Sequence, residues 1–512
     1  MKSSERSQSV WKGTAPLREY PALSGDTTAE VCVVGAGIAG MTTAYLLARE
    51  GKSVIVLDDN AVGGGETGQT TAHLASAQDD RFVAIEKAHG QDGSRTAYES
   101  HQAAIERIEQ IVAREDIDCD FVRVDGYLFP GPGQSSSRLD EEMEAAHRAG
   151  FGDVEKLATA PVTTFNTGPC LRFPRQGQFH PLKYVQGLAK AIERDGGRIH
   201  TGSHVTGVEG GLRPKVTGES FSVTAEAVVI ATNSPISDLV SIHTKQAPYR
   251  TYVIGARIPR GVVPTALYWD DLDPYHYVRL QRDERSDDHD VLIVGGEDHK
   301  TGHQNDAEER FARLEAWTRE RFPVETVDYR WSGQVMEPVD YMAFIGRDPS
   351  GMRNVYVATG DSGQGMTHGT IAGILITDLI AGRANPWEKL YDPSRVTLAA
   401  GSVKEFVKEN LDVAVQYTDL VKPGEVGSEA EIAPGTGCIL RRGTAQVAAY
   451  RDERGVLHER SAICTHLGCV VQWNGLEKSW DCPCHGSRFG TDGSVLNGPA
   501  RTPLAPVAAE EA

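Results

Sequence analysis

The chain contains, at residues 30–58, the sequence EVCVVGAGIAGMTTAYLLAREGKSVIVLD. An apolar run leads into the glycines Gly35, Gly37 and Gly40, and a second apolar run ends at Asp58. This order predicts a buried strand, a tight turn, a helix and a second strand. In such a unit the glycines allow the turn, a close approach of backbone to a pyrophosphate, and tight helix packing, while the terminal carboxylate accepts a hydrogen bond from a ribose hydroxyl. The stretch predicts a dinucleotide site but does not decide between NAD and FAD.

A second glycine-rich loop follows directly, with the sequence GGGETGQTTAHL at residues 63–74. From here the chain resembles the D-amino acid oxidase-like flavoenzymes of the glycine and sarcosine oxidase type, in which this loop runs along the FAD pyrophosphate. The resemblance returns at residues 177–181, around Val205, at residues 227–233, and at residues 354–367, NVYVATGDSGQGMT. In the family, the helix that starts in this last segment points its N-terminus at the flavin, where a partial positive charge stabilises the reduced, anionic form.

The resemblance covers about residues 28–395 and implies FAD as the cofactor. His73 lies near the position where some family members attach FAD covalently, but its spacing from Gly68 is one residue longer, so we expect non-covalent FAD. The residues that the resemblance assigns to FAD are Gly35, Gly37, Ile38, Ala39, Gly40, Asp58, Gly65, Glu66, Thr70, Thr71, Ala72, His73, Val205, Ala231, Thr232, Gly360, Asp361, Gly365, Met366 and Thr367.

Residues 248–346 change to a strand-like pattern, which predicts the antiparallel sheet of the family's substrate half. The family implies oxidation of an amine or amino acid C–N bond, with hydride transfer to the flavin. Candidate catalytic residues are Tyr252, Tyr277 and Arg279; Tyr268, His276 and Arg250 are further pocket candidates. An arginine could bind a substrate carboxylate through two parallel hydrogen bonds. A purely structural role on a strand competes for each of these residues, and the segment DHKTGH at 298–303 is interpreted as a polar turn rather than a metal site.

Two short segments near the end carry cysteine and histidine, CTHLGC at residues 464–469 and CPCHGS at residues 482–487. Two thiolates and two imidazoles are the ligand set of a Rieske [2Fe–2S] centre, with Cys464 and Cys482 on one iron and His466 and His485 on the other. A zinc site also uses these residue types, but two separate loops of this kind fit the cluster better.

The same two segments resemble the Rieske family beyond the ligands. Cys469 and Cys484 match the cysteines that cross-link the cluster loops in respiratory-type members, which implies a disulfide bond. Phe489 stands where high-potential members often carry a tyrosine that bonds to a ligand sulfur. Since such hydrogen bonds tune the cluster, we expect an intermediate reduction potential.

Composition limits the partners and the location. The 512 residues include 71 acidic and 52 basic side chains, a net charge of −19, which argues against a nucleic acid or an anionic membrane as partner. The first residues show no apolar signal segment, and three glycines interrupt the uncharged run at residues 31–48. We therefore expect a cytoplasmic protein with no integral membrane segment.

The predicted fold is an α/β FAD-binding Rossmann-like domain with an antiparallel-sheet substrate domain, plus a small all-β Rieske domain. An apolar face formed by Val403, Phe406, Val407, Leu411 and Ala414 predicts a linker helix docked on the flavin domain. The expected boundaries are an N-terminal arm at 1–28, the flavoprotein at 29–395 (FAD-binding parts at about 29–95, 170–245 and 346–395, substrate parts at about 96–169 and 246–345), the linker helix at 396–420 and the Rieske domain at 421–512.

The two cofactors together predict a relay. A flavin takes two electrons and releases them singly, whereas the cluster takes one at a time. We therefore expect a dehydrogenase for a small amine or amino acid that passes electrons through the cluster to an external acceptor: a quinone, an iron–sulfur protein or a cytochrome. Two alternatives stay open, an NAD(P)H-dependent flavoprotein reductase with a Rieske module, for which the sequence shows no second nucleotide motif, and a non-enzymatic redox sensor.

Overall fold

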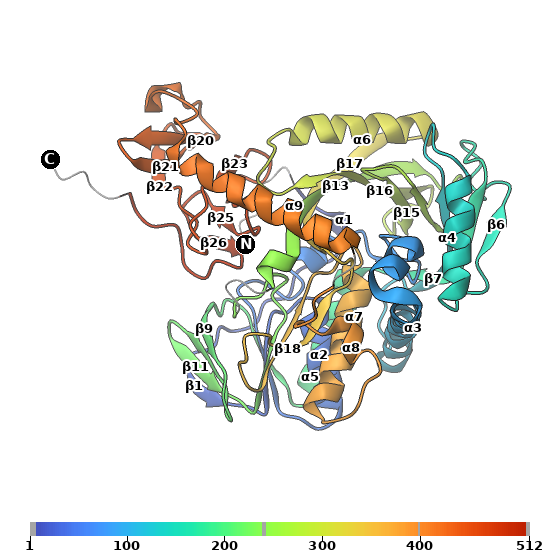
Figure 1. Ribbon diagram of the computed structural model, residues 1–512, viewed down its shortest axis with the longest axis horizontal. Coiled ribbons are helices and arrows are strands. Elements are labelled where there is room, and N and C mark those ends of the chain that lie inside the picture. The colour runs from blue at the N-terminus through green and yellow to red at the C-terminus, as the bar shows by residue number, and fades with distance from the viewer. Residues whose placement is uncertain (1–6, 238–241, 398–399, 508–512) are drawn as a thin grey trace.

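The computed structural model describes residues 7–237, 242–397 and 400–507 (Figure 1). A six-stranded sheet forms the centre of the FAD-binding part, in the order β18-β19-β12-β2-β3-β8. Its strands are β2 (Val31–Val34), β3 (Val54–Leu57), β8 (Arg198–His200), β12 (Ala227–Ile230), β18 (Phe344–Arg347) and β19 (Val355–Thr359). All neighbours pair in parallel except β18 and β19. Every residue of β2 and β3 is buried, as parallel strands covered on both faces require.

Helices and a small sheet cover this centre. The helices are α2 (Ile38–Arg49), α5 (Pro181–Arg194), α7 (Gly365–Ile380) and α8 (Glu388–Tyr391); the second sheet has the order β1-β11-β10-β9. Its strands are β1 (Gly25–Thr28), β9 (Val205–Glu209), β10 (Lys215–Gly218) and β11 (Phe221–Thr224). The turn from β2 into α2 depends on glycine, because Gly35 has φ +110° and a Cβ there would overlap the carbonyl oxygen of Ala231.

The substrate part is built on a nine-stranded sheet, in the order β17-β13-β16-β15-β14-β5-β7-β4, with β6 paired to β7. The strands are β4 (His73–Leu74), β5 (Val122–Phe129), β6 (Glu155–Leu157), β7 (Cys170–Gln178), β13 (Gln246–Pro259), β14 (Leu267–Asp270), β15 (Tyr277–Arg282), β16 (His289–Lys300) and β17 (Thr326–Pro338). Helix α6 (Ala307–Arg321) packs on one face, and α3 (Phe82–Glu115) and α4 (Ser137–Arg148) lie toward the other end (Figure 1). Strand β7 thus pairs within this sheet, although its residues fall in the segment assigned from sequence to the FAD-binding part.

The Rieske domain consists of two small antiparallel sheets. One contains β20 (Thr436–Arg442), β21 (Ala445–Arg451) and β22 (Leu457–Ser461); the other contains β23 (Gln472–Asn474), β24 (Ser479–Asp481), β25 (Arg488–Gly490) and β26 (Val495–Asn497). The short 3-10 turns η3 (Tyr417–Val421) and η4 (Glu429–Glu431) precede them. The remaining 3-10 turns of the chain are η1 (Glu66–Gly68) and η2 (His243–Lys245).

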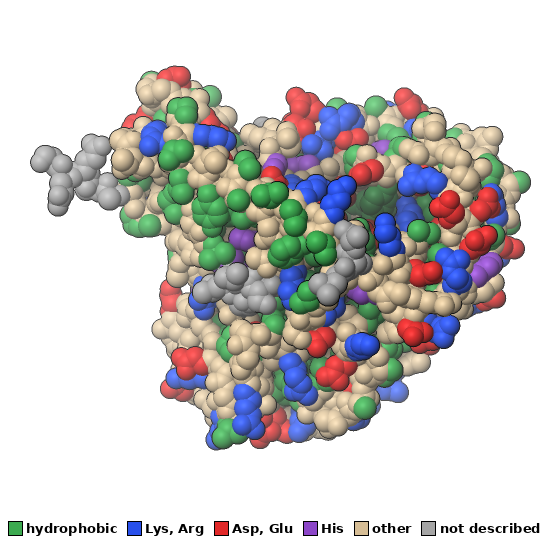
Figure 2. All heavy atoms as spheres, viewed as in Figure 1, with side chains coloured by type: hydrophobic (Ala, Val, Ile, Leu, Met, Phe, Trp, Pro, Cys, Tyr) green, Lys and Arg blue, Asp and Glu red, His purple; other side chains and the backbone are tan. Residues whose placement is uncertain are grey.

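Helix α9 (Ala400–Gln416) connects the flavin part to the Rieske domain. The expectation that its apolar face docks on the flavin domain is wrong. Phe406 and Leu411 are 40% and 62% exposed, whereas Ser402 and Glu409 are buried. Lys300 on β16 holds the helix through Glu409 (2.6 Å) and Asp412 (2.5 Å). Figure 2 shows hydrophobic side chains gathered over α9 and the adjoining Rieske domain. The ion pairs of Lys300 therefore help to hold this helix to the flavin part.

The segment before β1 is fixed to the FAD loop. Helix α1 (Val10–Thr14) buries Trp11 completely, and the indole Nε1 donates a hydrogen bond to the carbonyl oxygen of Thr70 (2.6 Å). Ser9 Oγ donates to the carbonyl oxygen of Gly68 (2.6 Å). Residues 7–14 are thus hydrogen bonded to the second glycine-rich loop at residues 63–74. No helix in the described part of the chain has the length and apolar character needed to cross a bilayer.

Candidate functional site

A large cavity lies where the six-stranded sheet, the nine-stranded sheet and the Rieske domain meet. The turn after β2 and the end of β3 form one wall, and strands β13 to β17 form another. A third wall comes from residues 495–501 of the Rieske domain, including β26. The two predicted cofactor sites are therefore neighbours in the folded chain.

Most residues assigned to FAD from sequence line this cavity. Four do not. Gly40 allows α2 to pack on the Gly35 carbonyl, Gly360 adopts φ +73° in the turn before α7, Ala72 is fully buried, and Thr367 bonds to His101 (2.9 Å). The residues that do line it are Gly35, Gly37, Ile38, Ala39, Asp58, Gly65, Glu66, Thr70, Thr71, His73, Val205, Ala231, Thr232, Asp361, Gly365 and Met366.

Asp58 fits the role of a ribose-binding carboxylate. Its two oxygens accept hydrogen bonds from the backbone N–H groups of Ala36 (2.6 Å) and Asn60 (2.7 Å), which fix it at the end of β3 beside the glycine turn. Burial raises the pKa of this carboxyl to about 7. A ribose hydroxyl is a neutral hydrogen-bond partner that suits either protonation state, so the residues present fit a dinucleotide.

His73 lies in the same cavity at the start of β4. Its Nδ1 lies 3.0 Å from Thr71 Oγ1, and its ring meets Tyr277 edge to face, with the centroids 5.8 Å apart. Burial, with the positive charge of Arg279 nearby, lowers the pKa of His73 to about 3. This imidazole is therefore neutral throughout the physiological range.

Among the predicted substrate residues, Tyr277 lines the cavity; its hydroxyl lies 2.5 Å from Thr251 Oγ1. Tyr252 and Tyr268 lie elsewhere in the sheet: Tyr252 bonds to His299 (3.0 Å) and packs on α6, and Tyr268 bonds to the carbonyl oxygen of Pro264 (3.0 Å). His276 bonds to Asp270 (2.9 Å) and also lies outside the cavity.

The two candidate arginines are buried and used structurally. Arg279 donates hydrogen bonds to the carbonyl oxygens of Ala72 (2.9 Å) and Phe179 (3.0 Å) and to the Gln281 side chain (2.6 Å), so it supports the FAD loop. Arg250 faces the Rieske domain, where its guanidinium lies 3.5 Å from Glu477 and 3.9 Å from Asp481. Neither lines the cavity, and neither is placed to bind a substrate carboxylate.

Sequence reasoning missed most of the side chains that face the substrate end of the cavity. These are Asp79, Thr251, Trp269, Tyr275, Asp298 and Glu337. Tyr275 donates a hydrogen bond to Asp79 (2.8 Å), and Asp298 occupies the segment interpreted as a polar turn. The alternation of strand residues was the available signal, because Thr251 and Val253 on β13 line the cavity while the intervening Tyr252 faces α6.

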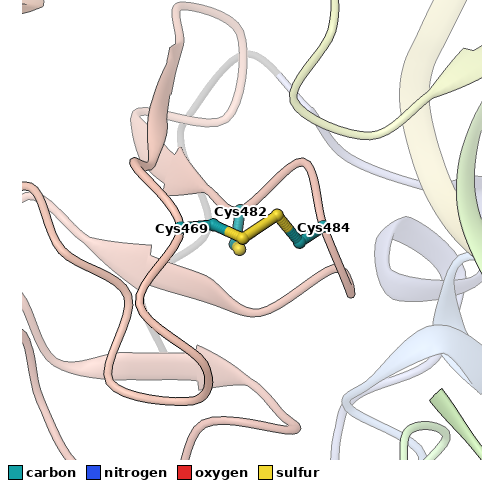
Figure 3. Close-up of side chains that lie close together, drawn as sticks. All are labelled: Cys469, Cys482 and Cys484. Carbon is teal, nitrogen blue, oxygen red and sulfur yellow. A yellow bond between two sulfur atoms is a disulfide. The ribbon is translucent and has the colours of Figure 1, made fainter. Parts of the chain in front are cut away.

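The two predicted cluster loops lie together. Cys469 and Cys484 are disulfide bonded, and Cys482 lies beside them (Figure 3). Cys464 and Cys482 are buried and not disulfide bonded, and a hydrogen bond between the two thiols lowers the pKa of Cys464 to about 7. The His466 and His485 rings lie 5.0 Å apart. Two thiols and two imidazoles in two loops are the donor set of a Rieske centre.

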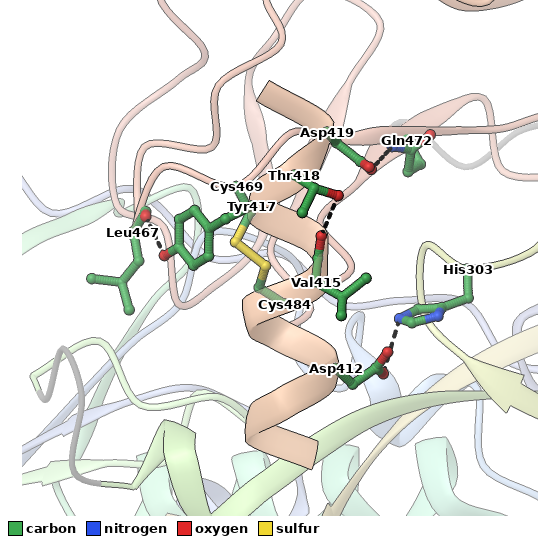
Figure 4. The surroundings of a disulfide bond; sticks show 10 residues. All are labelled: His303, Asp412, Val415, Tyr417, Thr418, Asp419, Leu467, Cys469, Gln472 and Cys484. Atoms are coloured by element: carbon green, nitrogen blue, oxygen red, sulfur yellow. Dashed lines mark hydrogen bonds and ion pairs between the residues drawn. A yellow bond between two sulfur atoms is a disulfide. The ribbon is translucent and has the colours of Figure 1, made fainter. Parts of the chain in front are cut away.

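The helix end beside the disulfide helps to hold these loops. Tyr417, which follows α9, donates its hydroxyl to the carbonyl oxygen of Leu467 (2.7 Å) in the first cluster loop, and Gln472 bonds to Asp419 (3.3 Å) (Figure 4). His303 of the flavin part approaches Asp412 on α9 (3.6 Å) in the same view. Helix α9 and the turn η3 that follows it therefore contact the flavin part and the loop that carries His466, respectively.

The predicted cluster histidines face the flavin part. His243 in η2 meets His466 edge to face (centroids 4.9 Å apart) and lies 5.8 Å from the His485 ring. Gln334, which lines the cavity, donates a hydrogen bond from Nε2 to the carbonyl oxygen of Gly486 (3.0 Å), next to His485. A single side chain thus touches both the cavity and a cluster loop.

The chain matches two family models. Residues 30–379 match the family described as DAO, FAD dependent oxidoreductase, and residues 422–508 match the Rieske [2Fe-2S] domain. These matches confirm the predicted FAD and [2Fe–2S] cofactors and the combination of the two folds. They also establish an oxidoreductase.

Individual relatives agree with the family matches. The Rieske 2Fe-2S iron-sulfur protein YhfW of Bacillus subtilis (strain 168) is 32% identical over 506 residues, covering 98% of this chain and 97% of YhfW. Gamma-glutamylputrescine oxidoreductase of Escherichia coli (strain K12) is 28% identical over 382 residues, covering 72% of this chain and 87% of that enzyme. The crystal structure of glycine oxidase from Geobacillus kaustophilus superposes with a TM-score of 0.60 at 17% identity, covering 72% of this chain and 99% of the oxidase, which shows a shared fold.

Proposed function

Because the chain belongs to the DAO family of FAD-dependent oxidoreductases and carries a C-terminal Rieske domain, we propose that it is a dehydrogenase for an amine or amino acid that passes electrons through its cluster to an external acceptor. The observation that carries the proposal is the shared wall of the cavity. Residues 495–498, 500 and 501 of the Rieske domain line the same space as the residues predicted to bind FAD, and the predicted cluster histidines face His243 of the flavin part.

The electron balance is consistent with such a relay. Oxidation of a C–N bond removes a hydride from carbon and a proton from nitrogen, leaves an imine that water hydrolyses, and yields two electrons. FAD held by the glycine turn and Asp58 would supply a two-electron acceptor, and a cluster held by Cys464, Cys482, His466 and His485 would supply a one-electron carrier. Each substrate molecule would then reduce two equivalents of a one-electron acceptor, or one quinone. The cavity walls would exclude water from the reaction, and the neutral His73 would add no positive charge to the cavity in which the amine reacts.

Anaerobic reduction of the purified holoprotein by a panel of amines and amino acids tests the proposal. Flavin absorbance and the electron paramagnetic resonance of the cluster are followed together. The proposal expects one class of amine to bleach the flavin and a Rieske signal to follow. Reduction of both centres by NADH, with none by any amine, would replace it with the reductase alternative; reduction by neither donor would favour the sensor.

A ligand variant separates the two halves of the relay. Cys464→Ser removes a predicted cluster ligand, so the amine should still bleach the flavin while reduction of a one-electron acceptor is lost. Cys170→Ser, at a buried cysteine on β7 in the flavin part, is the matched control and should keep both activities.

A further inference from the structure

The end of the cavity lined by β14 to β17 carries acidic side chains from three segments. Asp79 comes from the loop after β4, Asp298 from β16 and Glu337 from β17. Asp361, at the turn before α7, lines the cavity near them. These carboxyls influence one another: the negative charges of Asp79, Asp298 and Asp361 add to burial in raising the pKa of Glu337 well above its usual range.

Among the described residues that line the cavity, the positively charged groups are Arg501 and His204, which lie beside Asp59 rather than beside these acids. Of the lining residues, only Arg501 is a lysine or arginine, and its carbonyl oxygen bonds to His204, which pairs with Asp59 just after β3. Of the lining histidines, His73 and His368 are neutral, because burial lowers the pKa of His73 to about 3 and that of His368 to about 4. The hydrogen bond with Asp59 raises the pKa of the third, His204, to about 9, so its positive charge is paired with Asp59. Burial of carboxylates without a cation costs free energy that a positively charged ligand would recover.

The two nearby arginines are already engaged outside the cavity. Arg81 donates hydrogen bonds to the backbone carbonyl oxygens of Asp79 (2.8 Å) and Asp270 (3.2 Å). Arg310 on α6 pairs with Asp306 (2.8 Å) and donates to backbone oxygens of β16. Neither lines the cavity, so neither is placed to bind a carboxylate of the substrate.

Two further observations favour a cation. Asp298 Oδ1 is buried and has no hydrogen-bond partner among the described residues. This acceptor atom at the cavity wall is therefore available to a donor on a ligand. The aromatic side chains Trp269, Tyr275 and Tyr277 line the same end, and such rings attract ammonium groups. An acidic and aromatic wall suits an ammonium and repels a carboxylate.

The reacting nitrogen cannot supply this positive charge. It must be a neutral amine when its carbon gives up hydride, so a charge that balances the acids throughout the reaction has to belong to a second group. We propose that the cavity takes a diamine or polyamine rather than an amino acid, with the distal ammonium held by Asp298, Asp79 and Glu337 beside Trp269 and Tyr275. This rests on the proposed dehydrogenase function and names its substrate class.

The oxidation takes place at one amine of the diamine and balances in the same way as the oxidation described under the proposed function. The reacting carbon loses a hydride and the attached nitrogen a proton, and water converts the imine to an aldehyde and ammonia. The distal ammonium is unchanged, so the product is an amino aldehyde.

Four-carbon compounds that differ at the distal end test the proposal with the wild-type holoprotein. Anaerobic flavin reduction is measured by stopped flow with 1,4-diaminobutane, butylamine and 4-aminobutyrate, and with diamines of three to six carbons. The diamine of best length should show an apparent dissociation constant about tenfold or more below that of the matched monoamine. Flavin reduction by 4-aminobutyrate should be absent, and sarcosine and proline should react poorly.

Variants locate the ammonium site. Asp298→Asn and Glu337→Gln should each raise the apparent dissociation constant for the diamine about tenfold or more while changing that for butylamine far less. Asp287→Asn, at an exposed carboxylate between β15 and β16, is the control and should behave as wild type. If a cavity variant fails to retain FAD, the wild-type comparison of the three four-carbon compounds still decides.

The outcomes separate this inference from the function on which it rests. If amino acids reduce the flavin as well as or better than diamines, the dehydrogenase stands and the diamine proposal is wrong. Equal affinity for the diamine and butylamine, with both variants like wild type, also overturns it. If no amine of any class reduces a flavin that dithionite does reduce, both proposals fail.

Discussion

Asp298 is a buried carboxyl whose protonation should be visible in ligand binding. Burial raises its pKa to about 7, with the neighbouring acids Asp79 and Glu297 opposing ionisation and Arg310 favouring it. Since the folded-state pKa lies far above the usual value of 3.8, the neutral acid dominates below about pH 7 and the anion above it. A cation in the cavity should therefore bind more tightly as the pH rises through this value.

Tetramethylammonium is a suitable probe, because its charge does not change with pH and it has no amine to oxidise. Its dissociation constant, measured by perturbation of the flavin spectrum, should fall about tenfold between about pH 6 and pH 8. The Asp298→Asn variant should bind weakly at both pH values. Affinity that is constant or falls with pH in the wild type would contradict the assignment.

Single residues also show where sequence reasoning reached its limit. The glycine turn, Asp58 and the cluster residues are recognisable because the chemistry fixes their spacing along a short stretch. The substrate side chains are not, because a strand presents alternate residues to opposite faces and the sequence of β13 does not say which face is covered by α6. The phenol of Tyr252 makes it the candidate from sequence, yet its neighbour Thr251 lines the cavity.

At the level of elements, α9 shows that an apolar stripe alone does not identify the buried face. The periodicity of the sequence predicts a helix where α9 is observed. The pairing of Lys300 with Glu409 and Asp412, however, places the polar side of the helix toward the flavin part. Partners that lie more than a hundred residues apart in sequence cannot be seen in a local pattern.

Substitutions of exposed apolar residues on α9 and of the Lys300 partner on β16 should therefore change the free energy of unfolding by different amounts. Phe406→Ser or Leu411→Ser should change the free energy of unfolding by no more than about 0.5 kcal/mol, because both side chains are exposed. Lys300→Ala leaves the carboxylates of Glu409 and Asp412 without their partner and should lower the free energy of unfolding by about 1.5–3 kcal/mol. Chemical denaturation followed by tryptophan fluorescence measures both, and a larger loss in Phe406→Ser than in Lys300→Ala would contradict the docking described here.

The cluster loops are a second element-scale test. The Cys469–Cys484 disulfide closes a loop with a sequence separation of 15 residues, for which chain entropy predicts a stabilisation of about 3 kcal/mol. The Cys469→Ser/Cys484→Ser protein should lose thermal stability and most of its Rieske signal. Cys438→Ser, at a half-buried free cysteine on β20, is the control. Equal thermal midpoints and equal signals in the two proteins would mean that the ligand loops hold their shape without the bond.

For the whole molecule, the domains were predictable but their arrangement was not. Each domain carries its motif within its own sequence, whereas the interface depends on contacts such as Glu66 with Asn497 (3.0 Å), which lie 431 residues apart. The same holds for Arg250, whose partner Glu477 belongs to the Rieske domain. The arrangement matters for function because it sets the path from the cavity to the cluster.

Charge reversal at this interface should uncouple the two centres. In Glu477→Lys, an ammonium replaces the carboxylate that lies 3.5 Å from Arg250 and accepts a hydrogen bond from Ser332 (2.7 Å). Substrate should reduce the flavin at an unchanged rate, while reduction of the cluster slows by about tenfold or more. Glu453→Lys, at an exposed site in the Rieske domain, should leave both rates unchanged. Equal cluster reduction in both variants would place the electron path elsewhere.

The most direct test of the relay is single-turnover reduction of the holoprotein by its best amine, followed by stopped-flow absorbance and freeze-quench electron paramagnetic resonance at several protein concentrations. The account predicts that the flavin is reduced first and that the Rieske signal then grows at a rate independent of protein concentration, because the electron moves within one chain. A cluster that stays oxidised while the flavin is fully reduced, or one whose reduction rate rises in proportion to protein concentration, would contradict it.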